Sequence, residues 1–151
     1  MNRPGVGIGI FAVNNAKTKI LIGKRIKEKL WGLPGGKLEH GEEFIESSIR
    51  EMKEETNIEI KDESKWSVIC SFNCVEKEKH YHWFDIYVRV FLNEDEEAQL
   101  FNNEPDKCEK WEWFSYDDLM QNYNLLFYPL KIFLTRYKIQ SMNDIISLNT
   151  V

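Results

Sequence analysis

Three glutamates in the segment 33–58 have a spacing that would place them on one side of a helix. Glu51, Glu54 and Glu55 are related as i, i+3 and i+4, so a helical turn brings their side chains to one face. Like charges on one face repel one another, and Lys53 projects elsewhere. A solvated acidic face is the commoner meaning of such a pattern. A crowded set of carboxylates is, however, what a hard divalent ion such as Mg²⁺ requires, and the spacing favours a metal site.

The residues just before this helix point the same way. Gly35 and Gly36 allow the preceding loop to fold tightly against the helix, so that a backbone carbonyl such as that of Gly36 can join the metal shell. Arg50 precedes Glu51, and we expect it to point to a different side of the helix. There it can pair with a carboxylate such as Glu42 and lock the loop to the helix.

The helix that must carry these groups is predicted from its apolar period. It is expected to begin near residues 41–43, and Ile45, Ile49 and Met52 recur at spacings of four and three. Asn57 is a suitable end, because Asn tolerates the left-handed conformation better than most residues.

The rest of the chain predicts an α+β domain. Segments rich in Val, Ile and aromatic residues are expected to be strands: Gly5–Val13, Lys19–Arg25, Trp66–Val75, His82–Leu92 and Cys108–Phe114. Residues 58–60 are expected to resume in β fashion, and 115–122 and 126–138 to form helices. The polar connection 93–107 should be exposed, and the last ten residues should be a weakly held tail.

Composition limits the possible functions. A chain of 151 residues suits one domain, 1–151, and a net charge of −5 argues against binding a nucleic acid polymer. No apolar run approaches 18 residues, so no membrane segment is expected. Three cysteines without a CxxC pair indicate reduced thiols rather than a zinc site, which favours a cytoplasmic location.

The acidic segment resembles the box of the Nudix hydrolases. That box reads Gly, five residues, Glu, seven residues, Arg-Glu, an aliphatic residue, any residue, Glu-Glu, any residue, Gly and an aliphatic residue. Its positions are filled here by Gly36, Glu42, Arg50, Glu51, Met52, Glu54, Glu55 and Ile58. Asn57 replaces the final Gly. The resemblance implies the Nudix fold, a mixed β-sheet sandwiched between helices (α/β/α).

The resemblance also implies a reaction, the metal-dependent hydrolysis of a nucleoside diphosphate linked to another group. Mg²⁺, or Mn²⁺, would be held by Glu51, Glu54 and Glu55 together with Gly36. The base role falls to Glu51 or Glu54, and Arg50 belongs to the same catalytic set. Several family members use a further acid from a later loop, and Glu104, Glu109 and Glu112 remain open as candidates.

Stretches outside the box narrow the substrate. RPGVGIGIF, LPGGKLEHGE, EPDKCEKWEWF and LFYPL resemble a MutT-like subfamily that includes the type 15 nucleotide triphosphate diphosphatases. This similarity implies a homodimer that cleaves (deoxy)nucleoside triphosphates, oxidised guanine nucleotides and related purines above all, to monophosphate and pyrophosphate. The substrate-binding residues it implies are Leu33, Gly35, Arg25, Asp85, Phe127 and Leu130. Asp85 stands where close relatives carry a small hydroxyl residue, so it could accept a guanine N–H or repel another base.

Two alternatives stay open. Other Nudix pyrophosphatases act on ADP-ribose or dinucleoside polyphosphates, and some Nudix domains are non-catalytic binding modules. The Pro and Tyr markers of the ADP-ribose and diadenosine enzymes are missing from the stretch SFNCVEKEK after the box. Every carboxylate of the box is retained, which argues against a binding module.

Overall fold

The computed structural model describes residues 3–149, which fold around one mixed β-sheet. The strands are β1 (Gly5–Val13), β2 (Ile20–Arg25), β3 (Trp31–Gly32), β4 (Gly35–Lys37), β5 (Trp66–Glu76), β6 (Tyr81–Phe91) and β7 (Cys108–Phe114). The helices are α1 (Phe44–Thr56), α2 (Glu94–Glu97), α3 (Tyr116–Gln121), α4 (Tyr128–Arg136) and α5 (Met142–Ile146).

The main path of the sheet runs β3-β2-β1-β6-β5, with β4 also paired to β1 and β7 to β2. Strands β1 and β6 are parallel along the whole of β1, although more than sixty residues separate them in the sequence. Strands β5 and β6 form a long antiparallel hairpin. This combination of parallel and antiparallel pairs is the mixed sheet that the sequence predicted.

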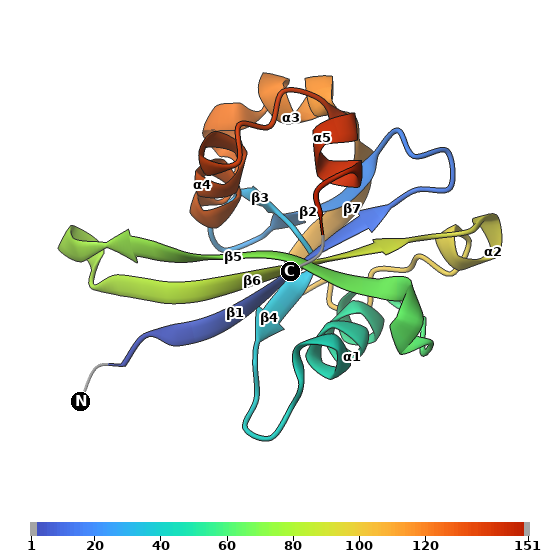
Figure 1. Cartoon of the computed structure of the whole chain (residues 1–151), viewed down its shortest axis with the longest axis horizontal. Coiled ribbons are helices and arrows are strands. Elements are labelled where there is room, and N and C mark those ends of the chain that lie inside the picture. Colours follow the sequence, from blue (N-terminus) through green and yellow to red (C-terminus); the bar gives the residue numbers. More distant parts are fainter. Residues whose placement is uncertain (1–2, 150–151) are drawn as a thin grey trace.

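Helices cover both faces of the sheet, with α1 on one face and α3, α4 and α5 on the other (Figure 1). Side chains of β1 alternate between the two layers, as the two-residue period of a strand requires. Ile8 and Ile10 pack in the core beneath α1, together with Met52. Phe11 packs in the core on the opposite face, together with Phe133 of α4. The expected α/β/α arrangement is therefore confirmed.

Three local expectations are wrong or incomplete. Residues 58–60 form no strand, although Ile58 and Ile60 are buried in the core beneath α1. The connection 93–107 is not wholly exposed, because it contains α2, and Glu96 of α2 is buried and pairs with Lys65 at 3.3 Å.

The expected loose tail is also wrong for residues 142–149, whereas residues 150–151 lie outside the described part. Helix α5 packs Met142 and Ile145 into the core. The guanidinium of Arg89 in β6 donates to the carbonyl oxygens of Ile145 and Leu148, at 3.0 and 2.7 Å. A buried cation that bonds to two backbone carbonyls holds the end of the described chain on the sheet.

Cys70, Cys74 and Cys108 are free and buried, as expected. Burial raises the pKa of both the Cys70 and the Cys74 thiol to about 12, so these groups are neutral thiols rather than nucleophiles. Between residues 3 and 149, no helix has the length and apolar character needed to cross a membrane.

Candidate active site

Helix α1 presents its glutamates toward the loop that precedes it and buries its other side. Met52 and Thr56 are fully buried in the core. The helix ends at Asn57, which adopts the left-handed conformation with φ of 67°. The apolar period therefore determined which side of the helix remained available for chemistry.

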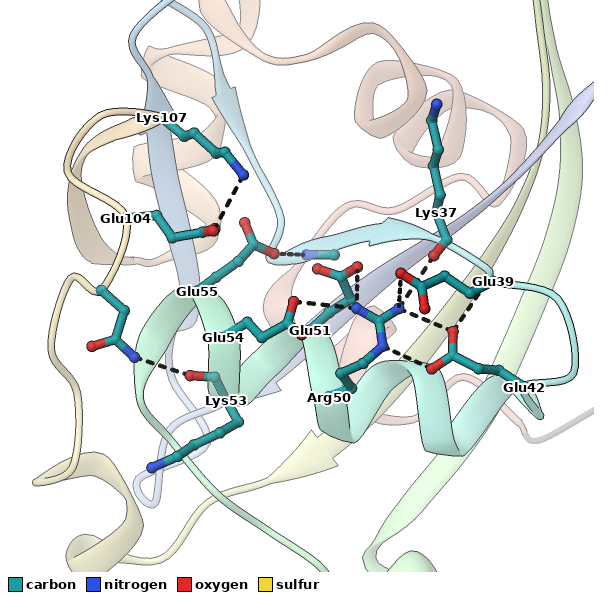
Figure 2. A network of polar contacts seen from close by, with 12 residues as sticks. Lys37, Glu39, Glu42, Arg50, Glu51, Lys53, Glu54, Glu55, Glu104 and Lys107 are labelled. Atoms are coloured by element: carbon teal, nitrogen blue, oxygen red, sulfur yellow. Dashed lines mark hydrogen bonds and ion pairs between the residues drawn. The ribbon is translucent and has the colours of Figure 1, made fainter.

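Arg50 is the centre of an ion-pair network on this side of α1 (Figure 2). Its Nε and Nη2 atoms donate to the two oxygens of Glu42, at 2.7 and 3.0 Å. Its Nη1 atom donates to Glu51 at 3.0 Å and to Glu54 at 3.2 Å. The hydrogen bonds from Arg50 lower the pKa of Glu42 to about 2, so Glu42 is ionised at neutral pH.

The expected pairing of Arg50 with Glu42 is therefore confirmed, but the expectation that Arg50 points away from the metal face is wrong. A helical wheel fixes the direction of Cβ only, whereas the guanidinium lies at the end of a long flexible arm. The guanidinium of Arg50 bends back and bonds to Glu42 of the loop and to two glutamates of the predicted metal site, Glu51 and Glu54.

The loop before α1 packs directly onto the glutamates. The backbone N–H of Gly35 donates to Glu55 at 2.8 Å. At Gly36 a Cβ atom would lie only 2.5 Å from the carboxyl carbon of Glu51, so a side chain at this position would displace that carboxyl group. The glycines thus allow the tight approach that the sequence predicted, and the carboxyl group of Glu51 fills the space that a Cβ at residue 36 would take.

The glutamates are crowded as well as buried. Burial raises the pKa of Glu55 to about 8, and the charges of Glu51 and Glu104 add to the shift against the opposing bond from Gly35. Burial likewise raises the pKa of Glu51, with smaller contributions from Glu54 and Glu104. Acids whose anionic forms are disfavoured in this way are suited to receive a cation.

Among the three later acids left open by the sequence, Glu104 is the one that approaches this cluster (Figure 2). Its loop is hydrogen-bonded to the end of α1 through the N–H of Asn103, which donates to the carbonyl of Glu55 at 3.3 Å. Glu112 instead pairs with Lys110 on β7 at 3.0 Å, and Glu109 is exposed on the same strand.

The chemistry of these groups fits a hard divalent ion. Glu51, Glu54, Glu55 and Glu104 offer oxygen atoms only, which is the preference of Mg²⁺ and Mn²⁺. Across residues 3–149, no three acidic, His or Cys side chains already converge on a single point in a way that could hold a metal ion. Arg50 bridges Glu51 and Glu54 through one oxygen of each carboxylate, so the second oxygen of each has no bond to the guanidinium.

Beside the carboxylates lies a cleft of about 380 Å³, and it is lined by every residue that the sequence assigned to substrate. These are Arg25, Leu33, Gly35, Asp85, Phe127 and Leu130. Gly36 lines the same cleft, so the cleft reaches the loop that touches Glu51. Their roles stay predictions, but the structure brings together residues from four separate parts of the chain.

Asp85 lies in the wall of this cleft with an unused carboxylate. The residue is 8% exposed, and its Oδ2 atom is buried without a hydrogen-bond partner. Burial raises its pKa to about 6, so the group is mostly ionised at neutral pH. The buried Nε atom of Arg25, which lines the same cleft, is likewise without a partner. Unsatisfied buried polar atoms are rare and call for an explanation, and a polar ligand in the cleft provides one.

The residues of the cleft that were missed from the sequence include three aromatic side chains of β6, namely Tyr81, Trp83 and Tyr87. Trp83, Asp85 and Tyr87 lie directly across from Gly5, Gly7 and Gly9 of β1. At each glycine a Cβ atom would lie between 2.5 and 2.6 Å from the opposite side chain. The alternating glycines were the available signal, because they mark a strand against which large side chains lie.

A larger open groove of about 1140 Å³ adjoins the cleft and shares Lys37, Tyr81 and Trp83 with it. Its remaining lining includes the cationic side chains of Arg3, Lys77 and Lys79. Lys37 lies over the ring of Trp83, at 5.6 Å from the ring centre. The groove thus combines positive charge with aromatic surface in a protein whose net charge is −5.

The sequence profile of the NUDIX domain family matches residues 3–133, which include the acidic helix, the cleft and the whole sheet. The chain belongs to the Nudix family. The arrangement around Arg50 is therefore the Nudix box of this member, with Asn57 at the position of its last glycine.

This Nudix protein is similar to several named hydrolases. It is 28% identical to Nudix hydrolase 2 of Arabidopsis thaliana over 84% of this chain, which spans only 46% of that relative. It is 28% identical to an RNA pyrophosphohydrolase of Pelagibacter ubique over 78% of each chain. The crystal structure of a MutT NUDIX hydrolase from Burkholderia pseudomallei superposes with a TM-score of 0.74 at 28% identity, covering 89% of this chain and 98% of that one.

Nudix hydrolases act on nucleotide substrates and generally use divalent metal ions such as Mg²⁺. The family assignment therefore agrees with a cleft that adjoins a cluster of carboxylates through Gly35 and Gly36.

Proposed function

We propose that this protein hydrolyses (deoxy)nucleoside triphosphates to monophosphate and pyrophosphate, with a preference for guanine nucleotides, including oxidised ones. The observation that carries the proposal is the position of Asp85. Its unpartnered carboxylate lies in the same cleft that reaches the box glutamates through Gly36. The cleft thus offers a group for the base, and at Gly36 it adjoins the acids that would hold the metal ion for the phosphates.

The reaction adds water across the anhydride between the α- and β-phosphates, so that one P–O bond breaks and one forms. A bound divalent ion would be held by Glu51, Glu54 and Glu55 with Gly36, and it would supply charge neutralisation of the phosphates. Glu51 or Glu54 accepts the proton of the attacking water. Arg50 keeps both carboxylates in place, because it already donates to each of them.

The base would lie between apolar and polar surfaces. Phe127 and Leu130 offer apolar contact, and Arg25, whose guanidinium lies 5.3 Å from the Phe127 ring centre, is suited to a phosphate. The ionised Asp85 accepts hydrogen bonds only. Guanine presents two adjacent N–H donors on its pairing edge, whereas adenine presents a ring acceptor beside its amino group. A carboxylate at this place favours guanine.

The test is a turnover panel with Mg²⁺, in which both products are identified. GTP, dGTP and an 8-oxidised dGTP are compared with ATP and with ADP-ribose. We expect monophosphate and pyrophosphate, with the guanine nucleotides preferred. In the isosteric variant Asp85→Asn, which offers one acceptor and one donor, the preference for guanine over adenine should fall about tenfold or more.

Two results would overturn the proposal. Release of AMP and ribose phosphate from ADP-ribose, without turnover of triphosphates, would identify a different Nudix pyrophosphatase. Equal and negligible turnover by the natural protein and by Glu54→Gln would identify a binding module.

A second candidate is a triphosphorylated RNA end, and the basic groove beside the cleft is the observation that favours it. In this reading the terminal nucleotide occupies the cleft and the following nucleotides stack on Trp83 and Tyr81, with Lys77 and Lys79 meeting the backbone phosphates. Several relatives are RNA pyrophosphohydrolases. The acidic net charge argues against this candidate.

The double variant Lys77→Ala/Lys79→Ala separates the two candidates, because neither lysine lines the cleft. If RNA is the substrate, the variant should lose activity on a triphosphorylated oligonucleotide and keep its activity on GTP. If free nucleotides are the substrate, the oligonucleotide should be a poor substrate for both proteins.

We also propose, from the family resemblance, that the chain acts as a single Nudix domain, forms a homodimer and works in the cytoplasm. Light scattering of the purified protein at several concentrations tests the dimer, and a monomer mass throughout would refute it.

A further inference from the structure

Asn57 stands where the Nudix box has glycine, and its side chain makes contacts that glycine lacks. Its backbone is left-handed, with φ of 67° and ψ of −1°, which is the conformation that glycine adopts without strain. Its side-chain Nδ2 donates to the carbonyl of Gln99 at 3.0 Å, and Lys53 donates to its Oδ1 at 3.2 Å. The replacement therefore keeps the helix end and adds a hydrogen bond to a segment more than forty residues away.

The segment that Asn57 reaches is the loop that carries Glu104. Two residues after Gln99, the N–H of Phe101 donates to the carbonyl of Thr56 at 2.9 Å. Two residues further on, Asn103 makes two hydrogen bonds to α1. Its backbone N–H donates to the carbonyl of Glu55, and its side-chain amide donates to the carbonyl of Lys53 at 3.1 Å. These bonds fasten the loop along the last turn of α1, directly before Glu104.

Glu104 then lies beside the acids of the box. Its side chain pairs with Lys107 at 3.3 Å and is near enough for its charge to affect Glu51 and Glu55 (Figure 2). The position of this carboxylate depends on the fastening of its loop, because no hydrogen bond between its carboxyl group and the helix is present among the described residues.

We propose that Asn57 is a positioning residue, whose side-chain amide fixes the loop 99–104 against α1 and so holds Glu104 beside the box glutamates. The expected effect on metal binding rests on the proposed metal-dependent function. The hydrogen bonds of Asn57, in contrast, do not depend on the identity of the substrate. It predicts an unusual result. Restoring the glycine of the family box should weaken the site, although glycine suits the backbone at this position better.

The experiment compares the natural protein with Asn57→Gly and measures Mn²⁺ affinity by electron paramagnetic resonance. We expect Asn57→Gly to melt at the same or a higher temperature and to bind Mn²⁺ about two- to tenfold more weakly, the loss expected for one hydrogen bond. The amides of Phe101 and Asn103 should exchange with deuterium faster. Lys53→Ala is the matched control, because it removes the other contact of the Asn57 side chain and should change neither Mn²⁺ affinity nor exchange.

A second comparison tests whether the effect passes through Glu104. In a Glu104→Gln background, Asn57→Gly should no longer change Mn²⁺ affinity, because the group that it positions is gone. Unchanged affinity and exchange in Asn57→Gly would overturn the inference, as would an equal loss of affinity in both backgrounds. If the protein binds Mn²⁺ but does not hydrolyse triphosphates, the proposed function is overturned. The Mn²⁺ affinities and amide exchange rates would still decide whether Asn57 positions Glu104.

Discussion

The closeness of Gly36 to Glu51 gives the sharpest test of the site. A methyl group at position 36 would lie 2.5 Å from the carboxyl carbon of Glu51 and 2.8 Å from its Oε2 atom. The atoms that must give way are the far end of a flexible side chain, so the backbone of β4 can stay in place. Gly36→Ala should therefore displace one carboxylate and leave the fold intact.

The size of the displacement follows from ordinary contact distances. Ordinary van der Waals contact begins at 3.4 Å, so the carboxyl carbon must move by about 0.9 Å (3.4 minus 2.5). A misplacement of about 1 Å at a reacting group lowers the rate by about 100-fold. We expect that loss in kcat/KM for pyrophosphate release from GTP with Mg²⁺, together with a raised Mg²⁺ requirement.

Gly32→Ala is the matched control. A Cβ atom there would meet Arg25 and Phe127 at 3.4 and 3.5 Å, which are ordinary contacts. Its kcat/KM should stay within about threefold of the natural protein, since no contact requires a displacement. If Gly36→Ala folds and retains the kcat/KM of Gly32→Ala, the reasoning that places Glu51 in the reaction is refuted.

Three further predictions concern charged side chains. Because burial raises the pKa of Asp85 from 3.8 to about 6, the native state disfavours its ionised form, and this penalty grows as the pH rises from 4 to 6. Asp85→Asn should raise the free energy of unfolding in urea by up to about 3 kcal/mol more at pH 8 than at pH 3.5, and an equal effect at both would contradict the assignment. Arg50→Lys keeps the charge, but lysine cannot make the two-point bond that the planar guanidinium makes to Glu42, so kcat/KM should fall about 10- to 100-fold. Unchanged kinetics would show that Arg50 has no part in the reaction. Arg89→Leu leaves the carbonyls of Ile145 and Leu148 without their donor, so hydrogen exchange in α5 should accelerate while that in β1 does not; uniform exchange would show that α5 is held by other contacts.

Features that depend on nearby residues could be predicted from the sequence. The face of α1 followed from the spacing of Ile49 and Met52, and the left-handed end of the helix followed from the tolerance of Asn57. The two glycines before the helix predicted a close approach, which Gly36 makes to Glu51. In each case the cause and the effect both lie within the segment 33–58.

Features that depend on distant residues could not be predicted in this way. The choice of Glu104 over Glu109 and Glu112 depends on hydrogen bonds between a loop and the end of a helix some fifty residues earlier. The docking of the C-terminal helix depends on Arg89, which lies on a central strand and gives no sign of its partners. Neither contact has a periodic signature, because each joins single residues rather than faces.

The pairing of glycines on β1 with large residues on β6 limits how this cleft can change its ligand. A Cβ atom at Gly7 would lie 2.6 Å from Oδ1 of Asp85, a short and buried side chain, and Gly9 and Tyr87 are related in the same way. A bulkier residue on one strand therefore requires a smaller one opposite. Mutant libraries that vary residues 7 and 85 together should yield folded proteins with new nucleotide preferences, whereas libraries that enlarge either residue alone should yield mainly misfolded ones.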